Sequence, residues 1–221
     1  MIDLTYDIGV NLNMYADNHQ FYSMSSDIEV VNDNLTQSAI DASECYTSNF
    51  LQGNLDEYRI LLLGSKLDNN INIVMDDKAV TSTDCLKLLG VSVDRHLRFD
   101  EHISKIYKKS SQRVGVLIRL RNLITTSTKL QLFKAAALPY LTYSHLVWHF
   151  CRASDSRKLE RVQERALRAI YCDRSSSYDK LLSVADLCTL RNRRLQDMAI
   201  LMYKTRQKST FVRSILQTSS I

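Results

Sequence analysis

The chain has 221 residues, of which 45% are hydrophobic and 24% are charged, which suits one large domain or two small ones. This composition excludes collagen-like, low-complexity and intrinsically disordered proteins, and the single Pro and five Gly argue against an all-β sandwich. The net charge of +5 hides a division, because residues 1–100 carry 6 Lys and Arg against 16 Asp and Glu, whereas residues 101–221 carry 23 against 8.

The two halves therefore carry net charges of −10 and +15. A basic half of this size could meet a polyanion such as a nucleic acid. Solvated helix faces rich in Lys and Arg would give the same excess of charge, so the charge alone leaves both interpretations open.

The amino terminus, MIDLTYDIGV, places acids where a secretory signal needs a basic flank followed by an apolar run. Polar residues also interrupt the most apolar stretch, residues 135–150, so no membrane-spanning run of about 18 residues is present. We expect an intracellular protein of the nucleus or cytoplasm that is neither secreted nor embedded in a membrane.

A β-hairpin is predicted near the start of the chain. Val10, Leu12 and Met14 alternate with Asn residues, which is typical of a half-buried strand. Asp17 and Asn18 tolerate the left-handed conformations of tight turns, and a second short strand follows them.

The remainder of the first half reads as one helix and further short strands. Ser26 and Glu29 have the spacing of a capping box and predict a helix over about 26–44. The strands are predicted at residues 60–63, 71–75 and 86–93.

The second half reads as all-α, which gives an α+β fold with a boundary near residue 98 and domains 1–98 and 99–221. Each helix is predicted from a capping residue followed by an apolar stripe at helical spacing, and Pro139 is predicted to kink or end one of them. The predicted caps are Asp100, residues 125–127, Ser154 or Ser156, and Thr189.

The Cys and His residues give only a weak metal signal. The five Cys are scattered and include no C-x-x-C, so neither a zinc ribbon nor a thioredoxin-like site is indicated. His145, His149 and Cys151 have a spacing that could supply three ligands of a metal site. Their apolar surroundings and the lack of a fourth ligand instead favour histidines that belong to the core or the surface and bind no metal.

Four segments stand out in order along the chain: Tyr15-Ala16-Asp17-Asn18, Asn54-Leu55-Asp56-Glu57, Leu89-Gly90-Val91 with Asp94 and His102-Ile103 behind it, and the stretch from Leu130 through Trp148 to Arg194. In this order they resemble segments of the reverse transcriptases of LINE-type (non-long-terminal-repeat) retrotransposons. The resemblance implies a partial polymerase palm in residues 1–98, with Leu89, Gly90 and Val91 in a strand near the primer terminus. It implies a helical thumb-like region in residues 99–221.

The resemblance also implies a damaged catalytic site. Nucleotidyl transfer uses two divalent cations, Mg²⁺ in this family, held by hard carboxylate oxygens. Here Tyr15, Asp17 and Asn18 would be vestiges of the metal hairpin, with Asp17 the one matching carboxylate, and Glu57 stands where the family has a Lys. The family's other catalytic Asp lies upstream of this hairpin, so we expect an inactive chain that binds no cofactor.

Binding of RNA or an RNA–DNA duplex is the activity expected to survive, through phosphate contacts from the basic helices. The candidate residues are Lys105, Lys108, Lys109, Arg113, Arg119, Arg121, Arg161, Arg165 and Arg168. Four aromatic residues that could stack on bases are expected to be core residues instead: Tyr107, Tyr140, Tyr143 and Trp148.

The leading hypothesis is a truncated, degenerate part of a LINE-type reverse transcriptase. The alternatives are a non-enzymatic module adapted to bind nucleic acid or protein, and an incomplete gene model of an active enzyme. In the leading hypothesis the hairpin has lost a neighbouring strand, so residues 1–98 are expected to be marginally stable and the helical half more stable.

Overall fold

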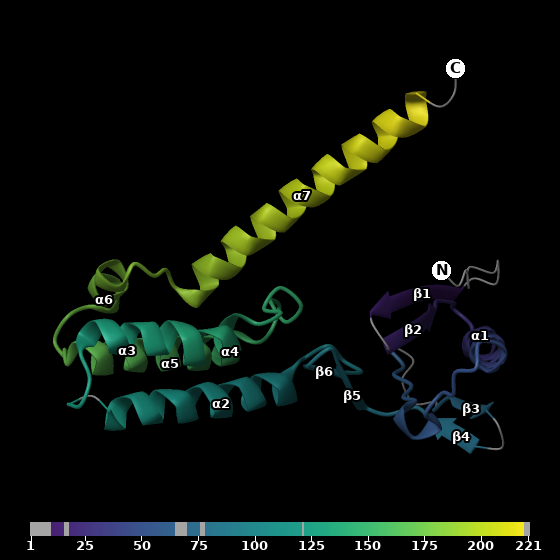
Figure 1. Cartoon of the computed structure of the whole chain (residues 1–221), viewed down its shortest axis with the longest axis horizontal. Helices are drawn as coiled ribbons and strands as arrows, with labels where there is room; N and C mark the ends of the chain where they lie inside the picture. The colour runs from purple at the N-terminus through teal and green to yellow at the C-terminus, as the bar shows by residue number, and fades with distance from the viewer. Residues whose placement is uncertain (1–9, 16–17, 65–69, 76–77, 121, 219–221) are drawn as a thin grey trace. The chain divides into compact units, whose positions relative to one another are not determined.

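The structure is a computed structural model that describes residues 10–15, 18–64, 70–75, 78–120 and 122–218 (Figure 1). The chain divides into two units: unit 1 combines residues 1–88 with 93–96, and unit 2 combines residues 89–92 with 97–221. Unit 1 contains one long helix and small antiparallel sheets, and unit 2 is dominated by helices. The fold class is therefore α+β, as predicted.

The described strands pair two by two into three small sheets, β1 with β2, β3 with β4, and β5 with β6. The elements of this part of the chain are β1 (Val10–Tyr15), β2 (Asn18–Ser23), α1 (Ile28–Ser48), the 3₁₀ helix η1 (Leu55–Glu57), β3 (Asn72–Met75), β4 (Lys78–Thr81), β5 (Cys85–Leu88) and β6 (Val91–Asp94).

The predicted hairpin of β1 and β2 is confirmed, with one difference in the position of the turn. Tyr15 pairs with Asn18, so Asn18 is the first residue of β2 rather than a turn residue. Asp17, which the sequence placed beside it in the turn, lies outside the described residues.

The predicted helix is also present, although it starts from a different cap. Asp27 rather than Ser26 is the N-cap of α1, and its carboxylate accepts the Glu29 N–H at 3.0 Å. The buried face of α1 brings Val31 against Ile71 and Ile73, which form the core of unit 1. Burying side chains of this size stabilises a fold by about 1.5–3 kcal/mol each.

Two of the predicted strands differ from the structure. In the predicted strand at residues 60–63, only Ile60 pairs, through an isolated parallel bridge to Ser82. The predicted strand at residues 86–93 is a hairpin, because Leu89 and Gly90 have φ of 45° and 86° and reverse the chain between β5 and β6. The predicted primer-region strand is therefore wrong for Leu89 and Gly90, and only Val91 lies in a strand.

Unit 2 builds its core from helices, with α2 running along α5 (Figure 1). Its elements are α2 (Asp100–Arg119), α3 (Thr126–Leu132), the π-helical segment η2 (Phe133–Ala137), α4 (Leu138–Thr142), α5 (Ala153–Tyr171), α6 (Tyr178–Ala185) and α7 (Leu190–Thr218). The predicted apolar faces of α2 and α5 are buried. Their buried members include Ile103, Ile106, Val114, Leu117, Leu159, Val162, Ala166, Leu167 and Ile170.

The predicted caps are right for two helices. Thr125 caps α3 by accepting the Thr128 N–H at 3.3 Å, and the Thr189 hydroxyl accepts the Asn192 N–H at 3.1 Å where α7 begins. In both cases a short hydroxyl side chain satisfies a backbone donor that the first turn leaves unpaired.

The predicted caps are wrong for α2 and α5. Phe99 is the N-cap of α2, with a left-handed φ of 59° and no side-chain hydrogen bond, and Asp100 is the first helical residue. Arg152 holds the corresponding place in α5, so neither Ser154 nor Ser156 is its cap.

Pro139 lies in the first turn of α4, directly after the π-helical segment η2. Because proline has no N–H, it cannot bond the carbonyl one turn earlier, and the helix changes its winding there. The sequence predicted a kink or an end at this position.

The apolar stripe predicted for α7 is buried only at its start. Leu190 is buried, whereas Leu195, Ala199, Met202 and Tyr203 are exposed. Among the described residues, no helix is long and apolar enough to cross a membrane.

Candidate nucleic-acid interface

One face of α2 carries exposed cations along its whole length. Lys105, Lys109 and Arg113 follow at intervals of four residues, and Lys108 and Arg119 lie on the same outward side; all five are exposed. The opposite side of α2 packs into the core of unit 2. Packing therefore fixes which way these cations point.

No carboxylate side chain interrupts this part of the sequence. Between Glu101 and Asp155 there is no Asp or Glu, while nine Lys and Arg occur. The cations after the first turn of α2 consequently have no acidic neighbour along their own segment. This arrangement concentrates positive potential on one surface.

Lys105, nearest the start of α2, differs from the other cations because it has an acidic partner. Its ammonium lies 2.6 Å from a Glu101 carboxylate oxygen and donates to the Ser92 hydroxyl at 3.1 Å. Lys105 is therefore partly neutralised, unlike the cations further along α2.

The α4 side of α2 holds an aromatic ring close to two of the cations. The Lys109 Nζ lies 5.9 Å and the Arg113 Cζ 6.0 Å from the centre of the Tyr140 ring. Tyr140 is half-buried, and α2 and α4 pack against each other. These distances are in the range of cation–π interactions.

The α5 side of α2 contributes a further pair of cations. The Arg165 guanidinium donates to the Ser111 carbonyl at 3.4 Å, which joins α5 to α2. Arg161 lies one turn earlier on α5, and both arginines are exposed. We call the exposed cations of α2, together with Arg161 and Arg165 of α5, the basic face; its members are Lys105, Lys108, Lys109, Arg113, Arg119, Arg161 and Arg165.

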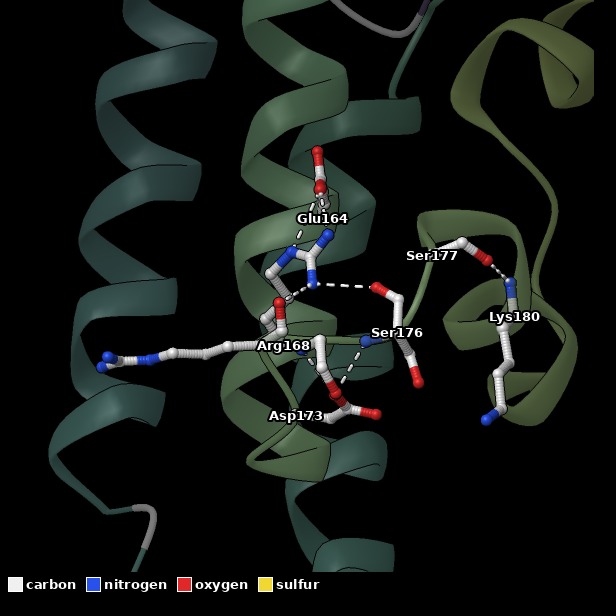
Figure 2. A network of polar contacts seen from close by, with 8 residues as sticks. Glu164, Arg168, Asp173, Ser176, Ser177 and Lys180 are labelled. Atoms are coloured by element: carbon white, nitrogen blue, oxygen red, sulfur yellow. Dashed lines mark hydrogen bonds and ion pairs between the residues drawn. The ribbon is translucent and has the colours of Figure 1, made fainter.

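Two predicted binding residues do not join this face. Arg168 donates to the Glu164 carboxylate and to the carbonyls of Arg174 and Ser176, so its guanidinium holds the loop that follows α5 (Figure 2). Arg121 lies outside the described residues.

The loop that Arg168 holds has its own anchor. The Asp173 carboxylate accepts the N–H groups of Ser175 and Ser176 at 2.8 and 3.0 Å, close to Arg168 (Figure 2). Hydrogen bonding from the side chain of Ser176, together with these N–H groups and the Ser175 hydroxyl, holds the pKa of Asp173 well below its usual range. Both residues therefore have structural roles in this loop.

Two buried histidines of unit 2 add little positive charge. The Nδ1 atom of His102 accepts the Ser92 N–H at 3.2 Å, and burial lowers the pKa of His102, with Lys105 adding to the shift. The Nε2 atom of His145 lies 2.9 Å from the Asp197 carboxylate, but burial outweighs that carboxylate and lowers the pKa of His145. Both rings are therefore mainly neutral near pH 7.

The described residues do not fit a two-metal centre. Among them, no three His, Cys, Asp or Glu side chains gather closely enough to hold an ion. The backbones of Tyr15 and Asn18 form the last pair of the hairpin, and Asp17 lies outside the described part of the chain. An amide such as that of Asn18 supplies no negative charge, whereas Mg²⁺ sites rely on carboxylates.

The second segment of the resemblance is a local turn. The Asn54 side chain accepts the Asp56 N–H at 3.2 Å and donates to Glu57 at 3.0 Å. Lys78 forms an ion pair with Asp56. These contacts stabilise the 3₁₀ turn η1. The cation among them, Lys78, pairs with Asp56 rather than standing in for the Lys that the resemblance expects at Glu57.

The four aromatic residues predicted to be core residues differ in burial, and Tyr140 is only half-buried. Trp148 is fully buried, as predicted, and its indole N–H donates to the Tyr143 carbonyl at 3.2 Å. Tyr107 and Tyr143 are exposed, which contradicts the prediction that they are core residues. The residue type alone does not determine whether an aromatic side chain faces the core or the solvent.

Sequence reasoning missed two features of unit 2. One is the position of Tyr140 beside two cations, which depends on how α4 packs on α2. The other is Arg194, which is buried, lies 5.4 Å from the Trp148 ring centre and donates to the Ser156 hydroxyl at 2.6 Å. The long segment without acids was the available signal for the basic face.

No protein-family profile matches the chain, and no solved structure gives a significant match. Two curated proteins of Drosophila melanogaster are similar to it. The RNA-directed DNA polymerase from mobile element jockey is 24% identical over 160 residues, which are 71% of this chain and 17% of that protein. The probable RNA-directed DNA polymerase from transposon X-element is 25% identical over 101 residues, 44% of this chain and 11% of that protein. The matched regions thus make up less than a fifth of either relative.

Proposed function

We propose that this chain, which is related to the RNA-directed DNA polymerases of LINE-type retrotransposons, binds the sugar–phosphate backbone of RNA or of an RNA–DNA duplex through unit 2. In this proposal unit 2 corresponds to the thumb-like part of such a polymerase and unit 1 to part of its palm. The observation that carries the proposal is the basic face, whose α2 cations lie in a segment without acids.

The chemistry of the basic face suits phosphate rather than base recognition. Its cations lie on rigid helices, with exposed side chains long enough to follow a phosphate backbone. Contacts of this kind give affinity with little sequence preference and release bound counterions, so binding weakens steeply as salt rises.

The test uses the whole chain and a fluorescently labelled RNA–DNA duplex, with the dissociation constant measured by anisotropy. A variant with Lys108, Lys109 and Arg119 changed to Gln should bind at least about tenfold more weakly at 0.1 M salt. The control changes Lys87, Arg174 and Lys180 to Gln, which removes the same charge from exposed positions outside the basic face. The control should bind within about twofold of the wild type.

Equal losses in the two variants would mean that net charge, rather than the basic face, drives binding. That result would overturn the assignment of the interface. Circular dichroism of both variants should match that of the wild type, because all six side chains are exposed.

We further propose that these 221 residues do not by themselves catalyse nucleotidyl transfer. The resemblance assigns them one metal-binding carboxylate, Asp17, with the neutral Asn18 beside it, whereas two cations against a triphosphate need more negative charge. Incubation with a primed RNA template, deoxynucleotides and Mg²⁺ should give no extension. Extension that disappears in the Asp17→Asn variant would refute this.

A further inference from the structure

Two cations on α2 lie close to the same aromatic ring. Lys109 and Arg113 are one helical turn apart, and each lies about 6 Å from the centre of the Tyr140 ring. Tyr140 belongs to α4, which packs against α2, so the ring comes from outside the helix that carries the cations.

This arrangement places like charges together without a neutralising carboxylate. Positive side chains four residues apart on a helix repel each other. Among the described residues, neither Lys109 nor Arg113 forms an ion pair, whereas Lys105 on the same helix is paired with Glu101. The electron-rich ring face offsets part of the repulsion and restricts both side chains to the α4 side of α2.

An anion held between the two cations would offset the rest of the repulsion. The Arg113 guanidinium offers a planar fork that matches two oxygens of a phosphate, and the Lys109 ammonium adds a point charge. Both side chains are exposed, so a ligand can reach them from solvent.

We propose that Tyr140 is a positioning residue that fixes Lys109 and Arg113 as a subsite for one phosphate group of a nucleic-acid backbone. The inference rests on the proposed function, since it assigns a role within the basic face. It differs from base stacking, because the two cations already approach the ring that a base would cover.

The test compares Tyr140→Phe with Tyr140→Leu in the whole chain, using the labelled RNA–DNA duplex over a salt series. Phe keeps the ring and should bind within about twofold of the wild type. Leu removes the ring and should weaken binding about three- to tenfold and reduce the slope of log K against log salt by about 1, the loss of one phosphate contact. Thermal unfolding of each variant shows whether α4 keeps its packing.

Single variants of the cations test the same subsite without changing Tyr140. Lys109→Gln and Arg113→Gln should each weaken binding, and either change should cost less in the Tyr140→Leu background, because the ring no longer positions the partner. Lys105→Gln, the control, should cost less than either because Glu101 already pairs with Lys105.

The outcomes separate this inference from the proposed function. If Tyr140→Leu binds like the wild type while Lys109→Gln and Arg113→Gln weaken binding, the basic face stands and the positioning role is overturned. If Tyr140→Phe loses as much as Tyr140→Leu, the hydroxyl rather than the ring matters, and the inference is wrong. If the wild type does not bind the duplex, the proposed function itself fails.

Discussion

His102 shows how burial sets the charge of a single residue in unit 2. It lies in the first turn of α2, where it accepts the Ser92 N–H and is 5% exposed. The desolvation of the ring lowers the pKa of His102 from its usual value near 6.5. A neutral imidazole at this position leaves the positive potential to the Lys and Arg side chains.

This pKa direction predicts a loss of stability in acid. Below about pH 6.5 the unfolded chain binds a proton on His102 more readily than the folded chain does. The free energy of unfolding is therefore highest above that pH and decreases as the pH falls through it. The pKa of His145 is lowered too and acts in the same direction. The free energy of unfolding measured in urea should therefore be lower at pH 5.5 than at pH 7.5.

The His102→Gln variant separates the contribution of this histidine from the effect of low pH on the other ionisable groups. Its stability should fall less between pH 7.5 and 5.5 than that of the wild type, since Gln does not titrate. The control is His96→Gln, whose side chain is exposed and which should show the wild-type pH dependence. An unchanged pH dependence in His102→Gln would contradict the explanation.

At the scale of elements, the turn between β5 and β6 combines a left-handed backbone conformation with close contact to an aromatic ring. Gly90 has a φ of 86°, and a Cβ atom added there would lie 3.4 Å from the Tyr143 ring. The Tyr143 hydroxyl donates to the Leu89 carbonyl at 2.6 Å, so this ring is fixed against the turn. Substitution therefore meets both backbone strain and close packing.

Gly90→Ala should destabilise the chain by about 1 kcal/mol. Gly115→Ala is the matched change in the interior of α2, where an added Cβ meets no atom within 4 Å. That control should stabilise the chain by roughly 0.5–1 kcal/mol, because Ala favours a helix. The urea midpoints of the two variants should move in opposite directions, and a shift in the same direction would contradict this account of the turn.

The elements that sequence reasoning found are those set by local pattern. Apolar spacing located the buried faces of α2 and α5, and the Thr125 cap follows from the chemistry of a hydroxyl before a helix. The turn at Leu89 was missed because a non-glycine residue takes a left-handed φ there, which is uncommon and has no signal in the sequence pattern. The exposure of the apolar stripe of α7 was missed as well. Helical periodicity shows that one face of a helix is apolar, but it does not show whether another element packs against that face.

The candidate interface divides in the same way. The basic residues of α2 could be listed from charge and spacing alone, since the buried side of the helix fixes the outward side. The structural role of Arg168 could not, because it depends on carbonyls in a loop that folds back on α5. The place of Tyr140 depends on the packing of α4 against α2, which is a tertiary contact.

At the scale of the molecule, the two units differ in how much structure supports their backbones. The core of unit 1 centres on Val31, Ile71 and Ile73, and its described strands form only two-stranded sheets. Among the described residues, unit 2 has a larger set of fully buried side chains, including Trp148 and Phe133. Two-stranded sheets with small cores are marginally stable, whereas packed helices rich in local contacts are more robust.

Hydrogen exchange of the whole chain should show this difference directly. Backbone amides in the middle of α2 and α5 should exchange at least about tenfold more slowly than those of β1 and β2 after correction for intrinsic rates, because opening the small sheets costs less free energy. Equal protection in the two units would contradict the expected instability of the first half.

The central claim is that the basic face holds the phosphate backbone of a nucleic acid. The most direct measurement is the affinity of the whole chain for a labelled RNA–DNA duplex over salt concentrations from about 0.05 to 0.3 M. Each phosphate contact should add about 0.9 to the steepness of the slope of log K against log salt. If four or five cations of the face engage, log K should fall linearly against log salt with a slope of about −4. No binding at the lowest salt, or an affinity that does not change with salt, would contradict the account.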